Sequence, residues 1–179
     1  MAKRYNQFFF LTQALKIMVP KFKVIEKKDI TDKDRKIFAE LLQKQGKVKG
    51  NLLLKADRCK EICIAYIGNA PVAIGGIKIK TESDFDKEKA DLIELSKDFE
   101  WELGYIYTDE NHHGKGFSNS IIEKLLDMNQ QENLMASTEI VTNPVMVHLL
   151  EKNNFVRKGK SWKSGIHQDE LGLFLRKKS

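Results

Sequence analysis

The sequence has few of the residues that cross-link a chain or interrupt its structure: three prolines and two cysteines in 179 residues. With only 11 glycines as well, a collagen-like chain and a long flexible linker are excluded. Cys59 and Cys63 are too few for a disulfide framework, and nothing completes a zinc site with them. On the strand expected there, residues four apart point the same way and lie too far apart to be bridged. We therefore expect two reduced thiols in a cytoplasmic protein.

Long apolar runs are also missing, so no transmembrane helix and no membrane partner are expected. Residues 1–20 place Lys3 and Arg4 before an apolar stretch, as a signal peptide does. Polar residues interrupt that stretch and no small-residue cleavage site follows it. We interpret residues 1–20 as an N-terminal arm or helix that docks on the domain formed by residues 21–179 or on a second subunit. A homodimer is compatible with the sequence.

An excess of acidic residues is absent, because 31 Lys and Arg outnumber 25 Asp and Glu and give a net charge of +6. This sign favours an anionic partner: nucleic acid, a membrane surface or a phosphate-bearing small molecule. The basic residues are mostly interleaved with acidic ones, which is also typical of a solvated surface. No groove combining aromatic and basic residues and no recognition helix is evident, so we expect no nucleic-acid partner.

Hydrophobic periodicity predicts a mixed α/β fold in one domain. Thr31 and Asp34 resemble a capping box that opens a helix ending near Gly46. A second helix follows Gly116, and a third begins at Asn143 with Pro144 behind it. The predicted strands are 21–29, 61–67, 72–80, 102–108, 134–141, 155–156 onward and 171–175.

The turn Gly114-Lys115-Gly116 joins the strand 102–108 to a helix. The first amides of a helix are unpaired, and with the positive end of the helix dipole they can bind phosphate oxygens. Glycine lets the backbone approach such a ligand, small Ser118 keeps the first turn open, and Lys115 adds a charge. Neither the P-loop pattern nor the dinucleotide-binding pattern is present.

Two blocks of the sequence resemble the GNAT superfamily of N-acetyltransferases. The family signature Gln/Arg-x-x-Gly-x-Gly/Ala corresponds to residues 113–118, where Gly116 is kept, His113 replaces Gln/Arg and Ser118 replaces Gly/Ala. The block Asn-x-x-Ala-x-x-Leu-Tyr-x-Lys-x-Gly-Phe corresponds to residues 143–155, with Leu150 in place of its tyrosine. The resemblance implies a central, mostly antiparallel sheet with flanking helices and a splayed pair of parallel strands.

The resemblance also implies an acetyl-CoA site and no metal. The pantetheine arm would lie along Ile106, Tyr107 and Thr108. The pyrophosphate would lie on the amides of His113, Gly114, Lys115, Gly116, Phe117 and Ser118. Asn143 would touch the cofactor arm, although Asn at this position is equally typical of a plain helix cap. His112 and His113 have no third metal ligand at a sensible spacing.

The implied reaction is acetyl transfer to an amine by direct attack in a ternary complex. A free lysine-type amine has a pKa of about 10.4, so a group that removes a proton is needed at neutral pH. Glu102 is our candidate base; the alternative is a carboxylate that orients the substrate or pairs with a lysine. The backbone N–H near Tyr107 or Thr108 is the candidate oxyanion donor. Since Leu150 leaves the family's tyrosine position vacant, Tyr105, Tyr107 and His148 are candidate proton donors to the thiolate.

We expect a small-molecule primary amine as acceptor. The alternatives are a protein or peptide acceptor and a non-catalytic acyl-CoA sensor. The acidic residues of 81–99 suggest a further hypothesis, that this segment lines the acceptor side and favours a cationic amine; an ordinary solvated loop is the alternative.

Overall fold

One seven-stranded mixed sheet organises the chain, in the strand order β1-β2-β3-β4-β5-β7-β6. The structure is a computed structural model that describes residues 19–166 and 168–178. The strands are β1 (Lys21–Glu26), β2 (Cys59–Ile67), β3 (Ala70–Ile79), β4 (Trp101–Thr108), β5 (Leu134–Glu139), β6 (Val156–Lys163) and β7 (Glu170–Arg176). The helices are α1 (Asp32–Gln45), α2 (Ile93–Ser96), α3 (Phe117–Met128) and α4 (Pro144–Lys152). Short 3₁₀ turns are η1 (Lys27–Asp29), η2 (Leu52–Leu54), η3 (Ala56–Arg58), η4 (Glu82–Phe85) and η5 (Glu110–His112).

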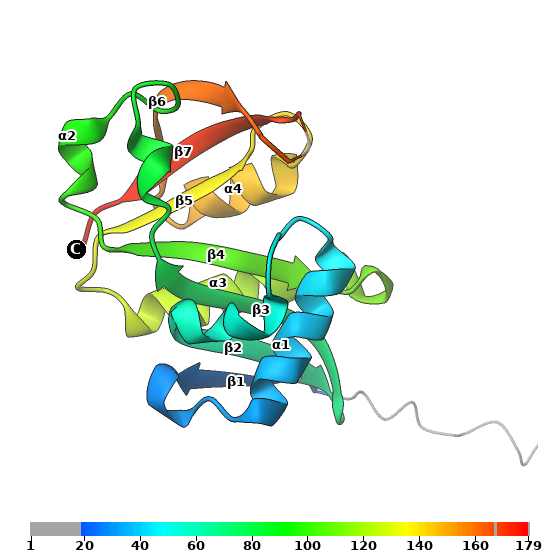
Figure 1. The fold of residues 1–179 in the computed structure, drawn as a ribbon. Coiled ribbons are helices and arrows are strands. Elements are labelled where there is room, and N and C mark those ends of the chain that lie inside the picture. Colours follow the sequence, from blue (N-terminus) through cyan, green and yellow to red (C-terminus); the bar gives the residue numbers. More distant parts are fainter. Residues whose placement is uncertain (1–18, 167, 179) are drawn as a thin grey trace, which may run out of the picture.

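The predicted mixed α/β fold is confirmed. All neighbouring strands are antiparallel except β4 and β5, which run parallel. The β4–β5 pairing is short: Trp101 faces Leu134 and Glu102 faces Met135, and no later pair follows in the described strands. The two strands therefore separate toward their carboxyl ends, as the resemblance implied. Figure 1 shows β1–β4 on one side of this separation and β5, β6 and β7 with α4 on the other. The proposed arm falls mainly on residues 1–18, outside the described residues.

Hydrophobic residues fill both faces of the sheet. On one face, α3 and α4 bury Ile121, Ile122, Leu125 and Leu150 against the sheet. On the other face, α1 buries Phe38, Leu41 and Leu42 against isoleucines of β1, β2 and β3. Burial of these apolar side chains is the main favourable contribution to folding. The two layers fix α1 and α3 on opposite faces of β4.

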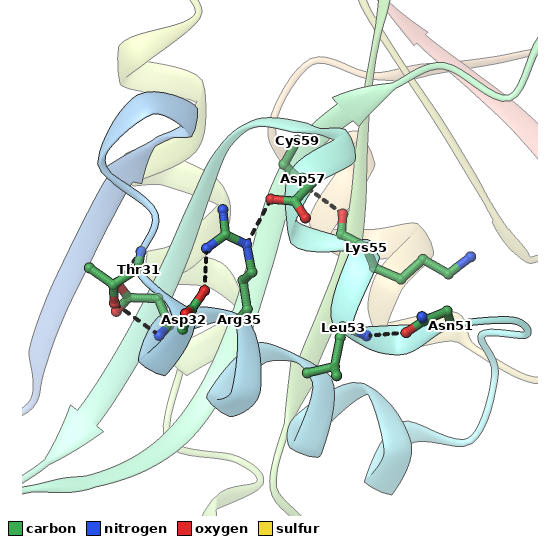
Figure 2. Close-up of polar contacts among 9 residues, drawn as sticks. Thr31, Asp32, Arg35, Asn51, Leu53, Lys55, Asp57 and Cys59 are labelled. Carbon is green, nitrogen blue, oxygen red and sulfur yellow. Dashed lines mark hydrogen bonds and ion pairs between the residues drawn. The ribbon is translucent and has the colours of Figure 1, made fainter.

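The first helix and the connection after it are held by specific polar contacts (Figure 2). Thr31 caps α1 in a capping box with Asp34, and the helix ends at Gly46, both as predicted; Gly46 adopts the left-handed conformation. Arg35 on α1 binds Asp57 at 2.8 Å and Asp32 at 3.0 Å. Asn51 accepts a hydrogen bond from the Leu53 amide at 3.1 Å. Contacts at residues 51–57 thus hold the far end of the α1–β2 connection beside α1.

Two bulges invert the alternation of side chains along their strands. In β2, the register shifts between Cys59 and Glu61. Cys59 consequently packs in the α1 layer and Cys63 in the α3 layer, so the expectation that both cysteines point the same way is wrong. Both are buried free thiols, and burial raises the pKa of each to about 12.

The second bulge lies in β4. Gly76 faces Gly104 and Ile74 faces Tyr107, so one residue of β3 is opposite two of β4. Tyr105 has a positive φ of 60° at this point. Beyond the bulge, Tyr105 and Tyr107 pack toward α1, while Ile106 packs toward α3. The bulge therefore turns both tyrosines to the face of the sheet that α1 covers.

Candidate functional site

A cleft of about 640 Å³, here called the α3 cleft, lies between the end of β4, the start of α3 and the start of α4. It brings together residues that the sequence analysis assigned to the cofactor. Nine of those ten residues line it: Ile106, Tyr107, Thr108, His113, Gly114, Gly116, Phe117, Ser118 and Asn143. The tenth, Lys115, does not line the cleft; its ammonium donates to the Asn111 carbonyl at 3.2 Å.

The glycine turn presents backbone amides to this cleft. Gly114 and Gly116 have φ values of 72° and 79°, a region that favours glycine. The Ser120 amide donates to the Gly116 carbonyl at 3.0 Å as α3 begins. The amides of Phe117, Ser118 and Asn119 precede that bond, so they have no carbonyl of the helix to bind. Gly116 is the N-cap and has no side chain to satisfy them. This arrangement suits an anionic group.

Two hydrogen bonds fix the turn against the end of β4. His113 Nε2 lies 2.8 Å from the Thr108 carbonyl oxygen, and Thr108 Oγ1 lies 3.0 Å from Ser118 Oγ. His113, which occupies the first position of the predicted signature, therefore links the glycine turn to the end of β4. These bonds hold the α3 amides at a defined position relative to the backbone of β4.

Asn143 caps α4 and also lines the α3 cleft. Its side-chain oxygen accepts a hydrogen bond from the Met146 amide at 3.3 Å, and its Nδ2 donates to Thr138 Oγ1 at 3.3 Å. The predicted helix-capping role is confirmed. Contact of Asn143 with a cofactor stays a prediction.

A second space of about 260 Å³, here called the β4–β5 chamber, lies where these strands separate. Its polar walls come from Lys47, Lys78, Glu102, Ser137, Thr138, Glu139 and Ser164. It shares Gln45, Lys47, Ile106, Asn143 and Met146 with the α3 cleft. The two spaces therefore adjoin around the β4 backbone at Ile106.

Glu102 lies in the chamber, where Lys78 neutralises it. The two side chains form a buried ion pair. Glu102 Oε2 also accepts hydrogen bonds from the Thr81 amide and hydroxyl, both at 2.8 Å. Three donors therefore converge on one carboxylate oxygen, which holds Glu102 rigidly.

The sequence analysis missed a second ion pair in the chamber. Lys47 Nζ, on the α1–β2 connection, lies 2.6 Å from Glu139 Oε1 at the end of β5. Burial raises the pKa of Glu139. The hydrogen bond and charge of Lys47, together with hydrogen bonds from the backbone and Asn143, lower it by more, so the pKa lies below its ordinary value. Nearby, Gln45 Nε2 donates to the Ile106 carbonyl at 3.0 Å. The chain segment that ends α1 is thus attached to both separating strands.

The candidate proton donors lie in different places. Tyr105 lines the β4–β5 chamber, and burial raises its pKa to about 12. Tyr107 lines the α3 cleft, and burial also raises its pKa. Leu150, at the family's tyrosine position, is buried in the α3 layer and is among the residues that line the chamber. His148 is exposed on α4 and lines neither space.

None of residues 81–99 lines the chamber, and the contact of this segment with the chamber is made by Thr81, which donates to Glu102. Phe85 and Phe99 bury themselves with Trp162 of β6. The Ala90 carbonyl accepts a hydrogen bond from the Lys160 amide at 3.0 Å, and Asp91 pairs with the Lys160 ammonium. Phe85, Ala90 and Phe99 thus hold the later part of the segment in one apolar cluster with Trp162 of β6.

Residues 19–166 and 168–178 contain no group of three or more His, Cys, Asp or Glu side chains placed to hold a metal ion. Across the same residues, no helix is both long enough and apolar enough to cross a membrane.

Comparisons with known proteins agree with this geometry. A family model described as "Acetyltransferase (GNAT) family" matches residues 26–155. No curated protein sequence matches the chain.

Solved structures share the fold at low sequence identity. A chain of the NatC complex bound to Gag peptide and CoA has a TM-score of 0.68 and 13% identity, with 90% of this chain and 100% of that chain covered. The ribosomal-protein-S18-alanine N-acetyltransferase from Escherichia coli gives 0.61 and 11%, with 87% and 93% covered. Arabidopsis thaliana Naa50, in complex with the bisubstrate analogue CoA-Ac-MVNAL, gives 0.64 and 11%, with 87% and 97% covered.

Proposed function

This chain belongs to the GNAT family of acetyltransferases, and from that premise we propose that it transfers the acetyl group of acetyl-CoA to the primary amine of a small molecule. The observation that carries the proposal is the junction of two spaces at Ile106. One space presents free helix amides, and the other contains two carboxylates. A phosphate-bearing donor and a cationic acceptor can therefore meet at one point between β4 and β5.

The proposed donor site is the α3 cleft. The amides of Phe117, Ser118 and Asn119 bind the pyrophosphate, and the positive end of α3 adds electrostatic attraction. The pantetheine arm lies along β4 between Ile106 and Thr108, where the strand faces the cleft instead of β5. In this proposed arrangement the thioester lies at the junction, beside the β4–β5 chamber.

The proposed acceptor site is the β4–β5 chamber. Glu102 and Glu139 provide carboxylate oxygens that can accept hydrogen bonds from an incoming ammonium, Glu139 when Lys47 gives up its place. Because Lys78 and Thr81 already occupy Oε2 of Glu102, we assign Glu102 to orienting the amine through Oε1 or a bound water. Glu139 contacts a cation from the exposed side of the chamber, and we assign it to removing the proton. The amine then attacks the thioester carbonyl directly, and the backbone near Tyr107 stabilises the oxyanion.

The size of the chamber favours a small acceptor. A volume of about 260 Å³ is slightly smaller than the range of roughly 300–1,000 Å³ that ligand pockets usually enclose. The Lys47–Glu139 ion pair further narrows the access from the α1–β2 connection. A second candidate acceptor is the α-amine of a peptide, because the NatC and Naa50 structures of similar fold carry peptide ligands.

Thiol release from acetyl-CoA tests the proposal. Small primary amines are compared with short peptides that have a free N-terminus, and matched peptides with a blocked N-terminus are the control. We expect kcat/KM to be about tenfold higher or more for the best small amine, a difference of about 1.4 kcal/mol in transition-state binding. A higher kcat/KM for peptides than for small amines would support the peptide as the acceptor. If no amine released thiol from acetyl-CoA, both candidate functions would be refuted.

A further inference from the structure

Lys47 lies at the junction of the two spaces, beside the proposed acceptor site. Among the described lysines it is the one that lines both the α3 cleft and the β4–β5 chamber. Lys78 lines the chamber alone, and Lys49, two residues further along the same connection, lines neither space. The backbone at residue 47 follows directly on the glycine that ends α1, so the side chain enters the junction from a fixed helix end.

The contact of Lys47 shows where its amine lies. Nζ is 2.6 Å from Glu139 Oε1, and the Glu139 side chain is only 9% exposed. An ammonium on this carboxylate lies on the chamber side of the junction. The Lys47 side chain is itself 43% exposed, so the neighbouring atoms do not enclose it. A flexible stem of four carbons then lets the amine move a short distance while the backbone stays in place.

We propose that Lys47 is an internal acetyl acceptor: when no external amine is bound, the acetyl group of bound acetyl-CoA is transferred to Lys47 Nζ of the same chain. The inference rests on the proposed function, because it needs a donor in the α3 cleft.

The step balances without a further reactant. Lys47 Nζ loses a proton to Glu139, and its lone pair forms the C–N bond with the acetyl carbon. The C–S bond breaks, its electron pair leaves with sulfur, and the thiolate takes a second proton from the amine nitrogen to give CoA. The products are Nε-acetyl-Lys47, CoA and one proton, which Glu139 passes to the solvent. Acetylation removes the charge of Lys47, so its ion pair with Glu139 is lost.

Mass spectrometry of the full-length protein tests this. The protein is incubated with deuterated acetyl-CoA and no amine, so that new acetyl groups differ in mass from any acquired during expression. We expect label at Lys47 to appear about tenfold faster or more than at Lys49, since proximity favours the intramolecular reaction. The rate constant should not depend on protein concentration, because donor and acceptor are in one molecule. Lys78 should stay unlabelled, since its ion pair is buried and lies outside the cleft.

Two controls separate this reaction from chemical acetylation of surface lysines. CoA lacking its sulfur atom, added in excess, should suppress labelling at Lys47 and leave Lys49 unchanged. Lys47→Arg retains a cation for Glu139 but removes the acceptor, so one labelled site should be lost while the background is retained. Equal labelling of Lys47 and Lys49, or labelling at Lys47 that ignores the competitor, would overturn the inference.

The outcome also distinguishes this inference from the proposed function. Thiol release with an external amine but no label at Lys47 overturns the inference alone. An absence of both reactions overturns the inference together with the function on which it rests.

Discussion

The α3 cleft and the β4–β5 chamber adjoin, but they are built in different ways. The cleft comes largely from two continuous stretches, residues 106–119 and 142–149. The chamber collects side chains from the end of α1, β3, β4, β5 and the segment between β6 and β7. The α3 cleft offers mainly backbone amides to a ligand, whereas the β4–β5 chamber offers ion pairs between residues far apart in the sequence. A site built from the backbone of a short segment can be predicted from sequence, but a site built from distant side chains requires the folded structure.

The largest effect is expected from breaking the buried ion pair of the chamber. Lys78→Met leaves Glu102 buried without its cation, which should lower the free energy of unfolding by about 3–5 kcal/mol. Urea denaturation followed by circular dichroism measures it. Adding Glu102→Gln to this variant should restore much of the loss, because the uncompensated charge is then removed.

The Lys47–Glu139 pair, in which only the lysine is accessible, provides the comparison. Lys47→Met should cost less than Lys78→Met, about 1–3 kcal/mol, because Glu139 is only 9% exposed but the 43% exposed position of Lys47 lets water take the place of its ammonium. If the two lysine variants lost equal stability, the distinction between a structural ion pair and an accessible one would fail.

The next effect is on the cleft. Gly116→Glu introduces a side chain and a negative charge at the amides of α3, in a residue with φ of 79°. Affinity for CoA measured by calorimetry should fall about tenfold or more, equivalent to about 1.4 kcal/mol. Circular dichroism checks the fold, since the strained backbone is expected to cost about 1 kcal/mol. Unchanged affinity would remove the cofactor assignment from this turn.

Glu102→Gln should affect turnover and not CoA affinity, the reverse of Gly116→Glu. It alters the chamber and leaves the cleft intact, so we expect kcat to fall about tenfold while CoA affinity stays within about twofold. Steady-state kinetics and calorimetry on the same preparation separate the two quantities. If the variant and the wild type had equal turnover, the role of Glu102 would be structural, through its contacts with Lys78 and Thr81.

The smallest effect concerns pH. The pKa of Glu139 is lowered in the folded protein, so its contribution to stability is present above its ordinary value of about 4.3 and is lost as pH falls through the lower folded value. Lys47→Met removes the hydrogen bond and charge of Lys47 and leaves burial, a backbone hydrogen bond and the Asn143 contact, so the pKa of Glu139 should rise from its lowered value. The stability difference between wild type and variant should therefore grow as pH rises from the lowered wild-type value toward about 4.3. A constant difference across this range, in thermal unfolding, would contradict the ion-pair interpretation.

Local chemistry explains what the sequence could predict. The capping box at Thr31, the left-handed glycines at 46 and 116 and the cap at Asn143 each depend on neighbouring residues. Burial patterns of period two and 3.6 likewise set the strands and helices. The ten cofactor residues came from the resemblance of two short sequence blocks to the GNAT family, and nine of them line one cleft.

Long-range register explains what the sequence could not predict. Tyr105 adopts a positive φ although it is not glycine, so no residue type marks the bulge that turns it toward α1. Lys47 and Glu139 are 92 residues apart and meet only because α1 ends beside the separating strands. Glu139 at the end of β5 was visible as a charge on an otherwise buried strand, but its partner was not.

The bulge in β2 leaves one thiol in each hydrophobic layer, Cys59 in the layer of α1 and Cys63 in that of α3. Because both thiols are buried, a thiol-specific reagent reaches either sulfur only when the layer that covers it opens. Alkylation rates at the two positions thus record separately how often each side of the molecule opens, and the native sequence already contains both reporters.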